Sequence, residues 1–155
     1  MSAMFHAKKY NTSENGFSFI ELLLVVAIVA IIAASSAPFI SRFLRQNELE
    51  VATDKTVSVI RKAQSYAMSG KDNDIWGFCY TDENIRLYRN NCTSPVYSED
   101  FDLSKITVSG LTDISFSGDA GKRGEPSSEA VIIIENDAGT NSVSINYAGG
   151  ISLNQ

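Results

Sequence analysis

One acidic side chain, Glu21, lies at the start of a long apolar segment of the sequence. The residues from Leu22 to Ile40 carry no formal charge, and their number is close to the ~20 that a helix needs to span a membrane. A carboxylate inside a membrane helix costs roughly 2.5–3.5 kcal/mol and usually marks function. Glu21 therefore needs either interfacial water near the positive end of the helix dipole or a basic partner in a low-dielectric environment.

The two cysteines of the chain, Cys79 and Cys92, are the other candidates for chemistry. They lack the ligand spacing of a structural zinc site, so we expect no metal and no cofactor. In an oxidising compartment a disulfide between them would contribute about 3 kcal/mol by the chain-entropy argument, and two separate thiols are the alternative. A tight hairpin turning at Asp82-Glu83 would place Cys79 opposite Arg86, so the disulfide needs a longer loop or a contact across a strand end.

Catalytic motifs are absent from the sequence. It contains no Gly-x-Ser-x-Gly, no phosphate-binding loop and no metal motif with histidine, and its single histidine is His6. The acidic residues are scattered over expected strands and turns, where a solvated surface explains them. We therefore expect no enzymatic activity.

The distribution of charge predicts location and argues against nucleic acid as a partner. After Arg45 the chain is acidic and has no basic surplus for binding phosphate, although the pair Lys122-Arg123 forms a local exception. Lys8 and Lys9 precede the apolar segment and favour a cytoplasmic N-terminus. The acidic segment that carries both cysteines suits an extracytoplasmic location.

The hydrophobic pattern predicts one long helix followed by a sheet. Helical periodicity continues from about residue 17 to residue 68, with a kink at Pro38, and makes the second half of the helix amphipathic. The period then changes to two, which predicts antiparallel strands with one buried face for the helix to cover. The expected fold class is α+β, a long N-terminal helix packed on an antiparallel β-sheet. The expected strands cover residues 75–80, 84–89, 105–109, 113–117, 130–135 and 142–147.

The beginning of the chain resembles a type IV prepilin-like protein, which can be a pilin, a minor pilin or a type II secretion pseudopilin. Gly16 ends a short charged leader, Phe17 would begin the mature chain, and Glu21 is the fifth residue after that junction. Pro38 lies where the helix kink of this family is usually found. The resemblance covers residues 1–45.

This resemblance implies a processing site, a modification and a mode of assembly. In the family, a membrane peptidase cuts after the glycine and methylates the new amine, which here implies cleavage between Gly16 and Phe17 and N-methylation of Phe17. It also implies that Glu21 pairs with the processed terminus of a neighbouring subunit. The implied partners are the prepilin peptidase, other pilin or pseudopilin subunits in a helical filament, and assembly platform proteins.

The resemblance also implies a location and a division of the chain. The protein would span the bacterial inner membrane once, with a periplasmic C-terminal domain, and would later enter an extracytoplasmic filament. The expected parts are a leader at 1–16, a membrane and assembly half of the helix at 17–40, an amphipathic half at 41–70 and a β-rich domain at 71–155.

Two weaker patterns indicate a subfamily. Residues 143–151 look like the last strand of GspH/FimT-like proteins, the H-type pseudopilins and FimT-like minor pilins, and residues 60–67 of the helix resemble theirs. Cys92 lies far from the C-terminus, unlike the cysteines of major pilins, and no basic residue follows Arg123, unlike FimT-like proteins in DNA uptake. We expect a minor pilin or pseudopilin near the tip of a pilus or secretion filament. A FimT-like role in DNA uptake, a major pilin and an unrelated membrane-anchored binding module are the alternatives.

Overall fold

The computed structural model describes residues 16–118 and 124–154. The chain forms two compact units, of which the first ends at Phe39 and the second begins at Ile40. One helix, α1 (Phe19–Met68), contributes residues to both units. Its C-terminal end agrees with the predicted end at residue 68, and its first turn begins two residues later than predicted.

In the first unit, α1 carries its apolar side chains on an uncovered surface. All described residues from 16 to 35 are exposed, and Phe19 and Ile31 keep 77% and 67% of their surface accessible. By length and composition α1 is apolar enough to cross a membrane. The described part of the chain therefore leaves this surface to another molecule or to lipid.

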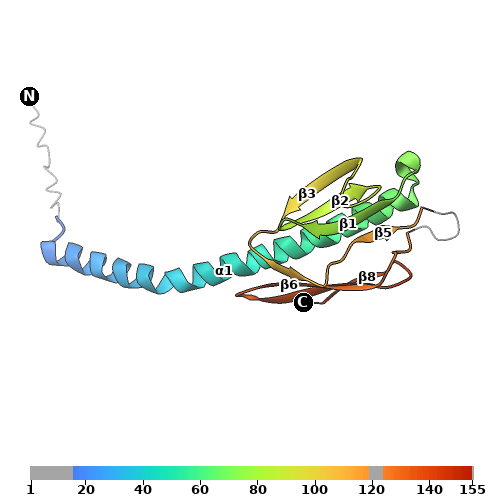
Figure 1. Cartoon of the computed structure of the whole chain (residues 1–155). Helices are drawn as coiled ribbons and strands as arrows, with labels where there is room; N and C mark the ends of the chain where they lie inside the picture. Colours follow the sequence, from blue (N-terminus) through green and yellow to red (C-terminus); the bar gives the residue numbers. More distant parts are fainter. Residues whose placement is uncertain (1–15, 119–123, 155) are drawn as a thin grey trace, which may run out of the picture. The chain divides into compact units, whose positions relative to one another are not determined.

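The second unit combines the rest of α1 with two antiparallel sheets of four strands each (Figure 1). A short 3-10 helix, η1 (Lys71–Asn73), follows α1 where the sequence predicted a stop. We call the sheet with the order β3-β2-β1-β5 sheet A and the sheet with the order β4-β6-β7-β8 sheet B. The strands are β1 (Trp76–Thr81), β2 (Asn84–Arg89), β3 (Tyr97–Asp102), β4 (Thr107–Ser109), β5 (Ile114–Phe116), β6 (Ala130–Asn136), β7 (Gly139–Ile145) and β8 (Ile151–Asn154).

The core of the second unit lies between α1 and the inner faces of the two sheets. Helix residues such as Ile60 and Ala63 are fully buried, and they recur at the three- and four-residue spacing of one helix face. In sheet A, residues 76–79 of β1 are all buried, so both faces of this strand are covered. Strands β6 and β7 of sheet B alternate buried residues with exposed or half-buried ones, as in a sheet with one covered face. This confirms the predicted fold class, a helix packed on antiparallel sheet. The largest fully buried side chains of the sheets are Trp76, Phe78, Ile85, Leu87, Ile114, Phe116, Ile132, Ile134 and Val143.

Two polar contacts fix α1 against sheet B and its loops. The buried Thr53 hydroxyl accepts a hydrogen bond of 3.1 Å from Asn141 Nδ2 on β7 and donates one to its own helix. Further along the helix, Gln64 Nε2 donates to the carbonyl oxygens of Gly124 and Gly149, at 2.9 and 2.8 Å. Because buried polar groups are costly without partners, these bonds restrict how the helix can slide along the sheet.

Two strands were missed by the sequence analysis. Strand β3 is an edge strand of sheet A, and its residues carry acidic side chains on both faces, which hides the apolar alternation. The segment 143–151, which resembled one last strand, is instead the end of β7, a turn and the start of β8. Gly149 has a φ of +78° in that turn, which a single extended strand does not allow.

Substituting Gly77 tests the packing of the outer face of sheet A. An added Cβ would lie 2.6 Å from the backbone oxygen of Ile114 and also meet the hydroxyl of Tyr88. We expect Gly77→Ala to lower the free energy of unfolding by about 1–3 kcal/mol. Denaturant unfolding of the full chain in detergent, followed by the fluorescence of Trp76, measures this change.

Gly139→Ala is the matched control, since a Cβ there would contact only Leu49 at an ordinary 3.7 Å. We expect its effect to stay within about 0.5 kcal/mol. Equal stability of the two variants would contradict this description of the packing around Gly77.

Candidate functional site

The junction between Gly16 and Phe17 lies just before α1, in a segment without regular secondary structure. Phe17 is 80% exposed, and a Cβ added at Gly16 would meet nothing within 4 Å. The packing described here therefore does not require a glycine at position 16. A requirement for glycine has to come from another molecule that contacts this segment.

Glu21 lies in the first turn of α1. The carbonyl oxygen of Ser18 accepts hydrogen bonds from the backbone N–H groups of Glu21 and Leu22, at 3.0 and 3.2 Å, and so begins the helix. The exposed carboxylate of Glu21 forms no hydrogen bond or ion pair with any residue in 16–118 or 124–154. Its position near the helix N-terminus favours a negative charge but supplies no counter-charge.

Pro38 lies within α1, in the first compact unit and one residue before its end at Phe39. The helix continues across this position without a break. The kink assigned to Pro38 from the sequence stays a prediction.

Cys79 and Cys92 are joined by a disulfide. The β1–β2 hairpin turns at Asp82-Glu83 and places Cys79 opposite Arg86, as the sequence predicted. Cys92 comes from the connection between β2 and β3, so the longer loop provides the contact. Cys79 is only 2% exposed, which means that this connection covers part of the outer face of sheet A.

Arg86 on the neighbouring strand β2 forms hydrogen bonds on the same outer face of sheet A. Its Nε and Nη2 atoms donate to the two carboxylate oxygens of Asp100 on β3, at 2.7 and 2.8 Å, and Nη1 donates to the carbonyl oxygen of Cys92 at 3.5 Å. The hydrogen bonds from Arg86, and then its charge, lower the pKa of Asp100 below its ordinary value. Such bidentate pairing fixes geometry as well as charge.

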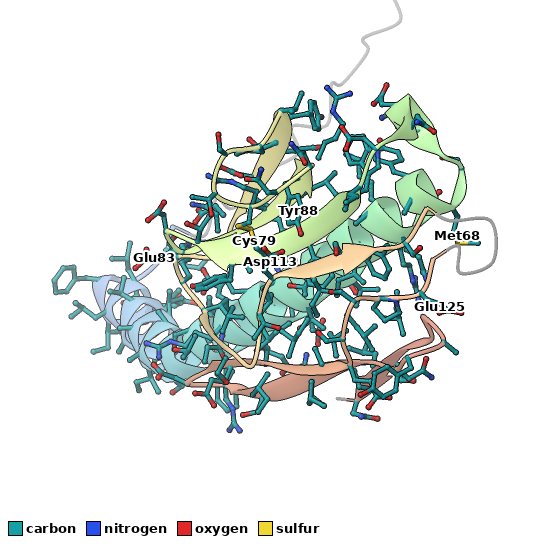
Figure 2. All side chains as sticks on the ribbon, turned by 45° about the vertical axis from the view of Figure 1, so that its right-hand side comes forward. Met68, Cys79, Glu83, Tyr88, Asp113 and Glu125 are labelled. Atoms are coloured by element: carbon teal, nitrogen blue, oxygen red, sulfur yellow. A yellow bond between two sulfur atoms is a disulfide. The ribbon has the colours of Figure 1, made fainter. Side chains whose placement is uncertain are left out.

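A partly buried hydrogen bond lies beside the disulfide. The hydroxyl of Tyr88 on β2 donates a hydrogen bond to Asp113 Oδ1 just before β5, and Figure 2 shows the two side chains together near β1. Burial raises the pKa of Tyr88, and the bond to Asp113 raises it further. Together the contacts of Arg86 and Tyr88 link β2 to β3 and to the residue that precedes β5, while the disulfide links β1 to the connection between β2 and β3.

Among the residues that the structure describes, no group of three His, Cys, Asp or Glu side chains could hold a metal ion. The contacts of Arg86, Tyr88 and Asp113 on sheet A were not predicted from the sequence. The register of Arg86 was predictable, but its partner Asp100 lies on the strand that was not predicted.

One sequence family matches the chain. The prokaryotic N-terminal methylation motif covers residues 11–37, a range that contains Gly16, Phe17 and Glu21. The match supports a type IV pilin-like N-terminal segment. No curated protein and no solved structure matched the chain.

The ion pair between Arg86 and Asp100 predicts a pH dependence of stability. The pKa of an unfolded Asp side chain is near 3.9, and the pKa of Asp100 in the folded state lies below that value. The ion pair therefore makes its full contribution to the free energy of unfolding above about pH 3.9. The contribution is lost as the pH falls through the folded-state pKa. Since Asp100 is partly exposed, we expect no more than about 1 kcal/mol at pH 7.

Asp100→Asn removes the carboxylate while it keeps the shape of the side chain. Urea unfolding of both proteins at pH 7, 5 and 3 should show a difference that shrinks below about pH 4. A difference that stays constant from pH 7 to pH 3 would contradict the assignment.

Proposed function

We propose that this chain is a structural subunit, a minor pilin or a pseudopilin, of a type IV pilus or a type II secretion filament. The observation that carries the proposal is the Glu21 carboxylate. It has no partner among the described residues, and it begins a helix segment whose described apolar side chains are all exposed. The proposed location is the bacterial inner membrane before assembly and an extracytoplasmic filament afterwards.

The exposed apolar surface of α1 explains both the proposed membrane-anchored stage and the proposed filament stage. Lipid can cover it while the helix spans the membrane, and neighbouring helices can cover it in a filament. Helices pack closely without a hydrophobic driving force only where small residues allow their backbones to approach. Ala27, Ala30, Ala33 and Ala34 supply such residues.

Glu21 would make the packing of helices in the filament specific for neighbouring subunits of this kind. Cleavage between Gly16 and Phe17 would create an amine only four residues before this carboxylate. In a bundle of helices, that amine on one subunit can neutralise Glu21 of the next, because leaving either charge alone in an apolar environment is expensive. An ordinary membrane anchor would account for the apolar residues but gives no reason for the acid.

The second unit supplies a rigid domain for contacts with other subunits. The disulfide between Cys79 and Cys92 fits an oxidising, extracytoplasmic compartment. The domain would act through its surface, without turnover of a substrate.

Processing at the junction is the first test. Intact-mass measurement of the protein purified from its native host should give the mass of residues 17–155 with one added methyl group on Phe17. Gly16→Leu should leave the leader attached, because a larger side chain would crowd the peptidase cleft. A full-length chain from the unmodified gene would exclude the proposed function.

Glu21→Ala is the second test. We expect the amount of this chain in sheared filaments to fall by about 100-fold, since removing one partner of a charge pair in an apolar site costs about 3 kcal/mol or more. Insertion into the membrane and folding of the second unit should persist. The measurement is immunoblotting of filament and membrane fractions.

Asp54→Ala is the matched control, because Asp54 is an exposed carboxylate on the same helix within the second unit. It should enter filaments normally. If both variants assemble as well as the unmodified protein, Glu21 has no role in assembly.

A further inference from the structure

The uncharged segment of the chain ends at Arg42, and its length by residue count matches the thickness of a bilayer. Residues 22–41, between Glu21 and Arg42, are 20 residues without a formal charge. At the rise of an α-helix they span ~30 Å, and the hydrocarbon core of a bilayer is also ~30 Å thick. With Glu21 at one boundary of the hydrocarbon, Arg42 therefore reaches the other boundary, in the layer of lipid headgroups.

Arg42 belongs to the face of α1 that is buried further along the helix. Steps of four and three residues back from Leu49 lead to Arg45 and then to Arg42, and such steps follow one helix face. Within the second unit this face is buried at Leu49, Ala52, Thr56, Ile60, Ala63 and Ala67. Position 42 itself is exposed. The basic start of this face thus lies directly before the part that the sheets cover.

The apolar residues around position 42 lie on a different face of the helix. Four apolar side chains here are each more than half exposed: Phe39, Ile40, Phe43 and Leu44. Further along α1, the corresponding positions carry exposed polar residues such as Asp54. This turn is therefore amphipathic in the opposite sense to the packed part of the helix. Packing within the second unit does not explain that reversal, whereas a membrane surface favours an apolar face beside a basic one.

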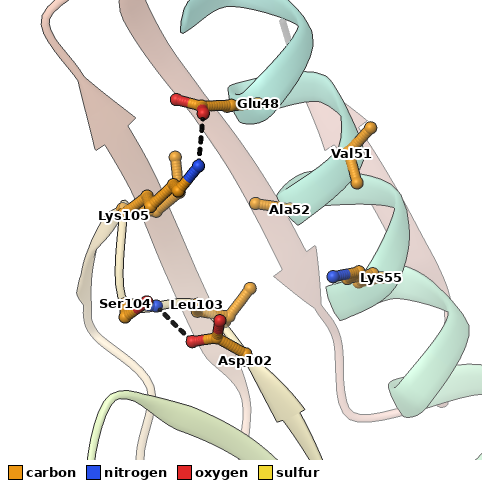
Figure 3. Close-up of a pocket in the computed structure, with 9 residues that line it drawn as sticks. Glu48, Val51, Ala52, Lys55, Asp102, Leu103, Ser104 and Lys105 are labelled. Atoms are coloured by element: carbon orange, nitrogen blue, oxygen red, sulfur yellow. Dashed lines mark hydrogen bonds and ion pairs between the residues drawn. The ribbon is translucent and has the colours of Figure 1, made fainter.

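The cations that follow Arg42 near this end of the second unit are already paired. Arg45 forms an ion pair with Asp137 in the turn between β6 and β7. Lys105 Nζ lies 2.9 Å from Glu48 Oε1, a contact that Figure 3 marks with a dashed line. Arg42 forms no ion pair with any carboxylate of residues 16–118 or 124–154. Its guanidinium group is left to bind an anion outside the chain.

The phosphate of an anionic phospholipid is the anion that fits this position. A guanidinium group can donate two parallel hydrogen bonds to a phosphate, and headgroup phosphates lie at the boundary that Arg42 reaches. The chain after Arg45 is acidic and would be repelled by an anionic surface. Attraction to such a surface therefore depends on the first turn of the second unit.

We propose that Arg42 binds the headgroup phosphate of an anionic phospholipid in the leaflet on the side of the second unit. Phe39 and Phe43 would lie beside it at the boundary of the hydrocarbon. The contact would fix the depth of the helix, so that Glu21 stays at the opposite boundary until assembly. This proposal rests on the proposed function, because it concerns the membrane-anchored stage.

Fluorescence quenching of the full chain in phosphatidylcholine vesicles tests the contact. The native cysteines are joined to each other, so a bimane label attaches only at position 44 of the Leu44→Cys variant. Two samples receive equal amounts of spin-labelled phosphatidylglycerol or spin-labelled phosphatidylcholine. We expect phosphatidylglycerol to quench about fivefold more, the ratio that corresponds to ~1 kcal/mol for a basic residue near an anionic surface.

Substitutions of Arg42 in the labelled chain identify the group that carries this preference. Arg42→Gln should remove most of it, and Arg42→Glu should make phosphatidylcholine the stronger quencher. Arg42→Lys should keep most of it, because the charge is retained, and high salt should weaken it. Arg61→Gln is the matched control, since Arg61 is an exposed cation on the packed part of the same helix. It should leave the quenching ratio unchanged.

The possible outcomes separate this contact from the proposed function. If neither lipid quenches the label, position 44 is not at a membrane, and the membrane-anchored stage of the proposed function fails together with the contact. If both lipids quench equally, or if Arg42→Gln keeps the preference, only the contact with the headgroup is wrong. Loss of the Arg42→Gln variant from sheared filaments, with an unchanged quenching ratio, would identify a carboxylate of another subunit as the partner and would also overturn it.

Discussion

The apolar surface of α1, with one acid at its beginning, is the constraint on which the rest of the structure depends. No described residue of the chain covers α1 from residue 19 to residue 35, so the apolar surface of this segment is left to lipid or other helices. Under the proposed function, Glu21 would decide between these environments, since a carboxylate tolerates an apolar site only with a counter-charge. The surface proposed to anchor the chain would in this way also direct its assembly.

A single helix serves two different environments through a change in its pattern. In the first unit apolar residues surround the helix, whereas in the second the buried apolar residues from Leu49 to Ala67 recur on the face that packs between sheets A and B. The opposite face carries Asp54, Lys55 and Arg61, which are exposed. The helix therefore offers lipid or helices one kind of surface and soluble partners another.

The strong periodic signals in the sequence were sufficient for much of this architecture. The helix end at Met68, strand β2 and the pairing of Cys79 with Arg86 all followed from local alternation and turn residues. Strand β3 could not be found in this way, because its inward-facing Glu99 is satisfied by Lys62 of the helix, an ion pair that only the tertiary structure reveals. Without β3, neither the partner of Arg86 nor the path of the chain around Cys92 could be deduced.

The attachment of Gln64 has a mechanical consequence. This side chain donates hydrogen bonds to two carbonyl oxygens on separate loops, and Thr53 accepts one from Asn141 on β7. The packed part of α1 is therefore attached at two positions along its length. Tension along the helix axis would load these bonds together in shear, and shared loading resists rupture better than sequential loading. A force along the helix axis would thus be distributed over several attachments to sheet B and its loops, and no single strand would bear it alone.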